Sequence, residues 1–169
     1  MANRSAADAA HTRWWQTFEA VFGIPFLAAV ALQLIVPLSL PRGPLTPAVI
    51  PAGALLIVAG LALVIRARRE FARQRQPTDP GHPTSQLVTE DVFAFSRNPL
   101  YLGGVCMLAG IALVLDLPWV FALLLPALVA CHYLLVVPEE TYLAAKFGDQ
   151  YHAYAATVHR WLGRRRGPR

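Results

Sequence analysis

Four long apolar blocks limit most strongly how this chain can fold. They run roughly over Val21–Leu40, Val49–Ile65, Leu100–Leu115 and, after a turn at Asp116–Pro118, on to Val137. A helix of about 20 apolar residues crosses the hydrocarbon core of a bilayer, and the blocks lack the two-residue alternation of half-buried strands. With 56% hydrophobic and 15% charged residues, the chain also carries little charge for a soluble domain. The sequence therefore predicts an all-α integral membrane protein with four transmembrane helices.

Turns and polar segments divide the chain into parts of one membrane domain. The stretch after the fourth block alternates charged and aromatic residues, which is typical of an amphipathic helix in the membrane interface, and Gly148 is the expected break in it. The predicted parts are an N-terminal tail (1–17), a first helical hairpin (18–75), a cytoplasmic loop (76–98), a second hairpin (99–138), the interfacial helix (139–162) and a basic tail (163–169).

The basic residues predict the orientation in the membrane. All of the 15 arginines and lysines except Arg42 fall on one side of the predicted topology. Because cytoplasmic segments are enriched in these residues, we expect both termini in the cytoplasm. The excess of arginine and alanine favours a bacterial source, and hence the inner membrane. The basic residues flank apolar blocks, which suits anionic lipid headgroups and not a nucleic-acid partner.

Two short polar strings lie where the second hairpin returns to the cytoplasmic face. One is Ser96–Gly104, which reads SRNPLYLGG, and the other is Pro138-Glu139-Glu140. Antiparallel helices would bring Arg97 and the two carboxylates together at the membrane boundary. Charged groups at this depth are costly, so such a cluster indicates a functional site.

Four residues of the first string also have structural interpretations that need no ligand. Asn98 and Pro99 are favoured at the N-cap and first position of a helix. Arg97 can reach lipid phosphates, or it can clamp a carboxylate with two hydrogen bonds. Tyr101 can be an ordinary aromatic residue of the interface.

The glycines and glutamates also leave two interpretations open. Gly103 and Gly104 can allow close helix packing, or they can line a groove in which a flat ligand meets bare backbone. Glu139 and Glu140 can form the acidic first turn of a new helix. They can instead bind an ammonium or sulfonium group, or accept a proton from a nucleophile.

Taken together, these strings resemble the isoprenylcysteine carboxyl methyltransferase and phospholipid methyltransferase superfamily of membrane enzymes. The resemblance extends from Pro83-Thr84 through the Arg97 string to the glutamate pair and Phe147–Tyr154. It implies S-adenosylmethionine as methyl donor, without a metal ion. The site residues that it implies are Arg97 and Glu140 as catalytic residues, and Asn98, Tyr101, Gly103, Gly104, Glu139 and Glu140 as cofactor-binding residues.

The chain also departs from this pattern. Many relatives have histidine at the position of Asn98, and asparagine cannot act as a general base. Asp91–Ala94 stands where relatives often have Gly-Pro-Phe/Tyr-Arg. We expect a membrane methyltransferase acting on a lipid-like or small hydrophobic acceptor, such as an isoprenylcysteine-type carboxylate, a phospholipid amine or a thiol. A non-catalytic scaffold or lipid-binding protein of the same fold, or a small transporter subunit, remain alternatives, and the sequence does not indicate an oligomeric state.

Overall fold

The structure is a computed structural model, and it describes residues 17–41, 43–44, 46–76 and 84–165. The predicted N-terminal tail up to residue 16, the middle of the polar loop (77–83) and the last four basic-tail residues lie outside the described residues. Arg42, which anchors the predicted orientation, lies outside them as well.

All regular elements in the described residues are helical, so the all-α prediction is confirmed. Residues 158 and 164 add a single isolated β-bridge. In chain order the elements are the π-helical turn η1 (Glu19–Gly23), α1 (Ile24–Ile35), α2 (Thr46–Arg73), the 3-10 turn η2 (Asp91–Ala94), α3 (Pro99–Val114), α4 (Pro118–Cys131), the π-helical turn η3 (His132–Val136), α5 (Val137–Phe147) and α6 (Asp149–Thr157).

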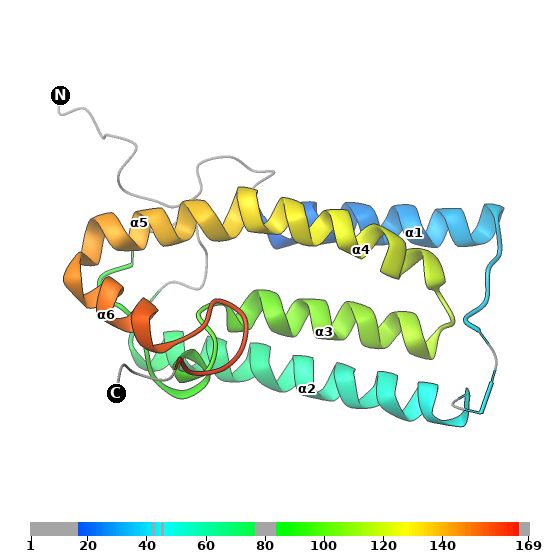
Figure 1. Ribbon diagram of the computed structural model, residues 1–169, viewed down its shortest axis with the longest axis horizontal. Helices are drawn as coiled ribbons and strands as arrows, with labels where there is room; N and C mark the ends of the chain where they lie inside the picture. The colour runs from blue at the N-terminus through cyan, green and yellow to red at the C-terminus, as the bar shows by residue number, and fades with distance from the viewer. Residues whose placement is uncertain (1–16, 42, 45, 77–83, 166–169) are drawn as a thin grey trace.

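The long helices form two layers (Figure 1). Helix α1 packs on α4 in one layer, and α2 packs on α3 in the other. Helix α5 continues the line of α4 beyond the bundle, and α6 folds back toward the ends of α2 and α3. The polar loop before α3 and the end of the chain meet at this same end of the molecule.

The helices have the length and surface of membrane helices. Two of them, Thr46–Arg73 and the continuous helix Pro118–Phe147, are long and apolar enough to cross a membrane, and Glu19–Ile35 and Pro99–Val114 are shorter apolar helices. Their outer faces expose large aliphatic side chains that a soluble monomer would rarely leave uncovered. Examples are Ile24, Leu27, Leu34, Ile50, Leu55, Val58, Leu125 and Val129. A membrane location is therefore supported, while four complete crossings remain a prediction.

The fourth predicted span does not end at Pro138, because α4, η3 and α5 form one helix from Pro118 to Phe147. A proline inside a helix lacks an N–H group and crowds the carbonyl group four residues earlier. The wider turn of η3 comes directly before it and accommodates the ring. The glutamate pair thus lies in the first turn of α5 as predicted, but this turn continues the helix of α4 and η3 and is not the free start of a new helix.

The C-terminal region is helical over part of the predicted range 139–162. The break at Gly148 is confirmed, since this residue has a positive φ of 51° between α5 and α6. Helix α6 ends at Thr157, and the chain then turns back in an irregular segment. The chain after Thr157 therefore folds over the end of the bundle instead of remaining helical to residue 162 (Figure 1).

Glycines bring α2 and α3 into close contact. A Cβ atom on Gly60 would lie 2.5 Å from the carbonyl oxygen of Gly103, and one on Gly110 would lie 2.5 Å from that of Gly53. Such distances leave no room for a side chain on either helix, so the backbones touch. This seam holds α3, and with it the start of the Arg97 string, in a fixed position against α2.

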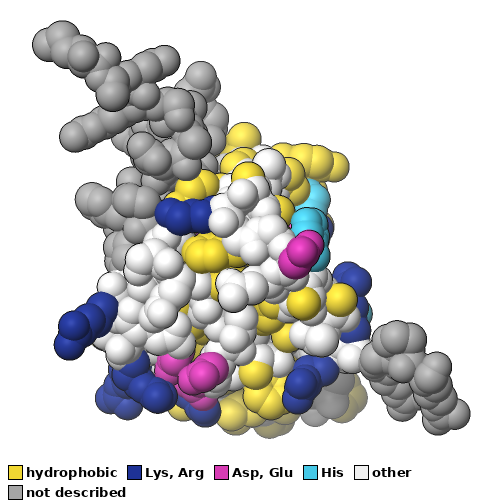
Figure 2. Space-filling model, turned by 90° about the vertical axis from the view of Figure 1, so that its left-hand side faces the viewer, with side chains coloured by type: hydrophobic (Ala, Val, Ile, Leu, Met, Phe, Trp, Pro, Cys, Tyr) yellow, Lys and Arg dark blue, Asp and Glu magenta, His cyan; other side chains and the backbone are white. Residues whose placement is uncertain are grey.

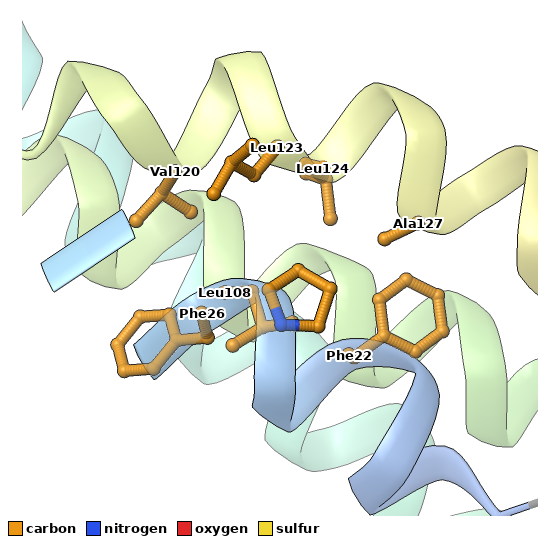
Figure 3. A pocket seen from close by; sticks show the side chains of 8 residues that line it. Phe22, Phe26, Leu108, Val120, Leu123, Leu124 and Ala127 are labelled. Atoms are coloured by element: carbon orange, nitrogen blue, oxygen red, sulfur yellow. The ribbon is translucent and has the colours of Figure 1, made fainter. Parts of the chain in front are cut away.

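Larger side chains fill the contact of α1 with α4. Phe22 and Ala127 belong to the buried cluster there, together with Leu135 and Val136 of η3. A partly open apolar hollow, of about 180 Å³ counted with its open side, lies between α1, α3 and α4 (Figure 3). Its lining side chains are all apolar: Phe22, Pro25, Phe26, Leu108, Val120, Leu123, Leu124 and Ala127. This hollow contains no group that could carry chemistry.

Candidate functional site

A second cavity, of about 540 Å³ counted with its open mouth, lies where the polar loop, α5 and α6 meet. The lining comes from α2, the polar loop, η2, α5 and α6: Phe71, Thr84, Gln86, Leu87, Val88, Phe93, Arg97, Asn98, Glu139, Glu140, Leu143, Tyr151 and Tyr154. Basic side chains lie around the edge of this end of the molecule (Figure 2).

The two polar strings converge at this cavity. Arg97 lies just before α3 and Glu140 in α5, and the Nη1 atom of Arg97 lies 3.3 Å from Oε1 of Glu140. The Arg97 side chain is only 9% exposed and also donates a hydrogen bond of 3.0 Å from Nη1 to the hydroxyl group of Tyr151. The predicted meeting of the guanidinium with the glutamate pair is therefore present.

Glu140 is bound by two arginines. Besides Arg97, it accepts hydrogen bonds from Nε of Arg160 at 2.9 Å and from Nη2 of Arg160 at 2.6 Å. This two-pronged arrangement is the strong geometry for a guanidinium and a carboxylate, and it raises the pKa of Arg160. Both oxygens of Glu140 are thus occupied by side chains of the protein itself.

Glu139 has a different environment from its neighbour. Its Oε2 atom accepts a hydrogen bond of 3.2 Å from the hydroxyl group of Tyr101, and no arginine or lysine of the described residues forms an ion pair with it. Tyr101 in turn stacks on Phe18, with ring centroids 6.5 Å apart. Glu139 is therefore the carboxylate of the cavity without a cationic partner in the described chain.

Asn98 begins α3 as predicted, but its side chain does not cap the helix. Its Nδ2 atom donates to the carbonyl oxygen of Arg160 at 3.1 Å, while its own N–H group donates to Oγ of Ser96. The expected capping hydrogen bond is therefore absent. Asn98 lines the cavity and ties the end of the chain to the start of α3.

Gly103 and Gly104 lie outside the lining of the cavity. A Cβ atom on Gly103 would meet the carbonyl oxygen of Gly60 at 2.7 Å, and one on Gly104 would meet the ring of Phe18 at 2.2 Å. Close packing accounts for both residues, since backbone or an aromatic ring already fills the space beside them. The structure shows no groove for a ligand at these glycines.

Two tyrosines of α6 were not predicted as site residues. Tyr151 and Tyr154 are three residues apart and so share one face of the helix. Tyr154 donates a hydrogen bond of 2.7 Å to the carbonyl oxygen of Phe93, and burial raises the pKa of both tyrosines. Both stay neutral at physiological pH, line the cavity and form hydrogen bonds through their hydroxyl groups. Their spacing in the sequence was the signal that could have identified them.

The departure from the family pattern at Asp91–Ala94 has a structural replacement. Asp91 forms an ion pair with Arg66 of α2, and the hydrogen bond from Arg66 lowers the pKa of Asp91. Val92 and Phe93 are buried beside α2, with the Phe93 ring centroid 5.0 Å from that of Phe71. The loop is thus held on α2 without the glycine, proline and arginine of the relatives.

Two buried polar atoms at the cavity have no partner among the described residues. They are Nε of Arg97 and Oγ1 of Thr84. Buried polar groups in proteins are nearly always hydrogen-bonded, because leaving them unpaired costs free energy. Together with Glu139, these atoms provide a hydrogen-bond donor for an anion, a hydroxyl group and a carboxylate in one cavity. This set fits a ligand that carries both a negatively and a positively charged group. No cluster of metal-ligating side chains occurs in the part of the chain that the structure describes.

A comparison with protein families finds one described as phospholipid methyltransferase, whose model matches residues 49–150. The match covers more than half of the chain and extends from α2 to the start of α6. It includes Arg97, Asn98 and both glutamates, whereas Tyr151, Tyr154 and Arg160 follow it. No curated protein and no solved structure matches the chain.

Proposed function

Since this chain belongs to the phospholipid methyltransferase family, we propose that it transfers a methyl group from S-adenosylmethionine to a lipid-like or small hydrophobic acceptor. The cavity at the end of the bundle is the proposed site. The observation that carries the proposal is the set of polar groups in it: the unpaired Nε of Arg97 and Oγ1 of Thr84, and the carboxylate of Glu139, which has no cationic partner in the described chain. These groups complement a molecule that bears a carboxylate and a cationic group.

The roles of the residues follow from their charges. Arg97 binds the carboxylate of the methyl donor, because its Nε atom is a buried donor without a partner in the described chain. Glu139 binds the donor's cationic part. Phe71 and Phe93, with the aliphatic side chains of the loop, offer an apolar wall for the adenosyl group.

When bound, S-adenosylmethionine supplies a methyl group on a positively charged sulfur atom. Transfer of this methyl group depends on positioning and on exclusion of water more than on acid–base chemistry. A carboxylate or thiolate acceptor needs no base. If the acceptor is an amine, Glu139 is the residue that takes the proton which the methylated nitrogen releases.

The acceptor is proposed to be hydrophobic because the cavity lies at the end of a bundle with an apolar outer surface. A lipid can then reach the site from the bilayer. We place the protein in a bacterial inner membrane with both termini in the cytoplasm, on the strength of the asymmetric basic residues. The bilayer and the acceptor are its proposed partners.

The experiment is a binding and transfer assay with the full chain in nanodiscs. We expect saturable binding of S-adenosylmethionine, transfer of labelled methyl groups to a total bacterial lipid extract, and loss of binding in Glu139→Gln. The exposed Glu90→Gln serves as the matched control and should bind like the wild type.

Each other result contradicts part of this proposal. Unchanged binding in Glu139→Gln overturns the site. Binding without transfer to any lipid or small thiol favours a non-catalytic protein of the same fold, and ion flux through liposomes without binding favours a transporter subunit.

A further inference from the structure

The end of the chain forms a closed turn after α6. The N–H group of His159 donates to the carbonyl oxygen of Gly163 at 2.9 Å, and that of Arg165 donates to the carbonyl oxygen of Thr157 at 2.8 Å. Gly163 has a φ of 101°, which side-chain-bearing residues rarely adopt. We call residues 158–165 the C-terminal turn.

The C-terminal turn is hydrogen-bonded to the backbone around Arg97. Gly163 donates its N–H group to the carbonyl oxygen of Phe95 at 2.7 Å, and Arg97 donates its own N–H group to the carbonyl oxygen of His159 at 3.2 Å. The side chain of Asn98 adds the hydrogen bond to the carbonyl oxygen of Arg160. Val158 is buried and Trp161 packs against the core, so the turn is docked at both its start and its middle.

This docking places the side chain of Arg160 on Glu140. Arg160 engages both carboxylate oxygens, and Arg97 approaches only one of them, at 3.3 Å. Arg160 thus supplies the main countercharge for Glu140. Without it, Arg97 would be the only described cation next to Glu140, and its guanidinium would pair with that carboxylate instead of with a ligand in the cavity.

We infer that Arg160 is a positioning residue of the methyl-donor site, which neutralises Glu140 and thereby keeps the unpaired Nε side of the Arg97 guanidinium available to bind the donor's carboxylate. Glu140 then holds the two arginines in place, and Glu139 alone binds the donor's cation. The inference rests on the proposed function. It goes beyond the family match, because Arg160 and the whole C-terminal turn follow residue 150, where the match ends.

The test compares two methyl donors in the full chain. One is S-adenosylmethionine, and the other is its decarboxylated analogue, which keeps the amine and the sulfonium but lacks the carboxylate that Arg97 would bind. For Arg160→Ala we expect the Kd of S-adenosylmethionine to rise about tenfold, which corresponds to the loss of one charge-assisted hydrogen bond. The Kd of the decarboxylated analogue should change by less than about threefold, because its binding depends on Glu139.

A second substitution separates this role from a merely structural one. Glu140→Gln removes the carboxylate that competes for Arg97, so Arg160→Ala combined with Glu140→Gln should recover most of the affinity for S-adenosylmethionine. Arg160→Lys should lie between the wild type and Arg160→Ala, since lysine cannot engage both oxygens in the same plane.

The inference is overturned if Arg160→Ala binds S-adenosylmethionine like the wild type. It is equally overturned if both donors lose affinity together and Glu140→Gln restores neither, since the turn would then act only through folding. Failure of the wild type itself to bind S-adenosylmethionine would instead contradict the proposed function.

Discussion

Helices α2 and α3 meet through backbone, whereas α1 and α4 meet through side chains. At the first contact, Gly53 and Gly60 face Gly110 and Gly103, and no Cβ atom fits at these four positions. At the second contact, rings and branched side chains interdigitate beside the partly open apolar hollow (Figure 3). The π-helical turns η1 and η3 also lie on the α1–α4 side. The first contact is thus fitted backbone to backbone at these glycines, whereas the second is packed through side chains.

The candidate site is divided between these two helix pairs. Arg97 and Tyr101 belong to the α2–α3 side, where η2 is also anchored, while Glu139 and Glu140 belong to the continuation of α4. Two side-chain contacts join the sets directly, Tyr101 with Glu139 and Arg97 with Glu140, and Arg160 of the C-terminal turn bridges Asn98 and Glu140. A ligand that contacts both sets would therefore connect the α2–α3 pair with the α1–α4 pair, which are packed differently.

The largest effect should come from filling the glycine seam. In Gly60→Val the new Cβ atom would lie 2.5 Å from the carbonyl oxygen of Gly103, so the backbones of α2 and α3 must separate. We expect a loss of about 3 kcal/mol or more in the free energy of unfolding, at the upper end of overpacking effects. Thermal unfolding in detergent, followed by circular dichroism, measures this loss.

Gly23→Ala is the matched control for that substitution, because a Cβ atom there would meet nothing within 4 Å. It should unfold at nearly the temperature of the wild type. Equal destabilisation by the two variants would mean that the α2–α3 contact is not the tightly fitted one.

A smaller effect is expected at the link between Tyr101 and Glu139. Tyr101→Phe removes the hydrogen bond to Oε2 of Glu139 but keeps the ring that stacks on Phe18. A hydrogen bond to a charged group contributes about 1.5–3 kcal/mol, part of which water can replace. We expect the Kd of S-adenosylmethionine to rise about fivefold with little change in unfolding temperature, as measured by titration calorimetry. A wild-type Kd in this variant would show that Glu139 needs no orientation from the α3 side.

The sequence predicted the α2–α3 side of the site better than the opposite side. Long apolar blocks indicate helices, and Asn98-Pro99 marks the start of α3 because local chemistry decides where a helix begins. The meeting of Arg97 with the glutamate pair followed from antiparallel geometry alone. The continuation of the helix through Pro138 could not be predicted, because η3 compensates for the proline and its formation depends on packing.

The different roles of Glu139 and Glu140 were also beyond prediction. The two residues are adjacent and chemically identical, but successive residues of a helix point about 100° apart. One therefore meets Tyr101 and the other meets two arginines. Arg160 contacts Glu140 only because the chain turns back after Thr157, and no local pattern in the sequence marks that return.

A third prediction concerns acid and tests how η2 is anchored to α2. The hydrogen bond from Arg66 lowers the pKa of Asp91 below its ordinary value of 3.8. The ion pair therefore contributes its full stability above pH 4 and loses it as the pH falls through the lowered pKa. We expect Asp91→Asn to unfold at a slightly lower temperature than the wild type at pH 7, with the two curves converging below pH 4. A constant difference down to pH 3 would contradict the role of this ion pair.

The smallest effect should come from the α1–α4 contact. Ala127 lines the apolar hollow between α1, α3 and α4 (Figure 3), and Ala127→Val adds two methyl groups at its wall. The gain from burying them and the cost of local crowding nearly cancel, so the free energy of unfolding should change by less than about 1 kcal/mol. Thermal unfolding of Ala127→Val beside Gly60→Val measures both contacts with one method. If Ala127→Val lowers the free energy of unfolding as strongly as Gly60→Val, the α1–α4 contact is as closely fitted as the glycine seam. The two sides of the site would then be held by equally tight helix packing.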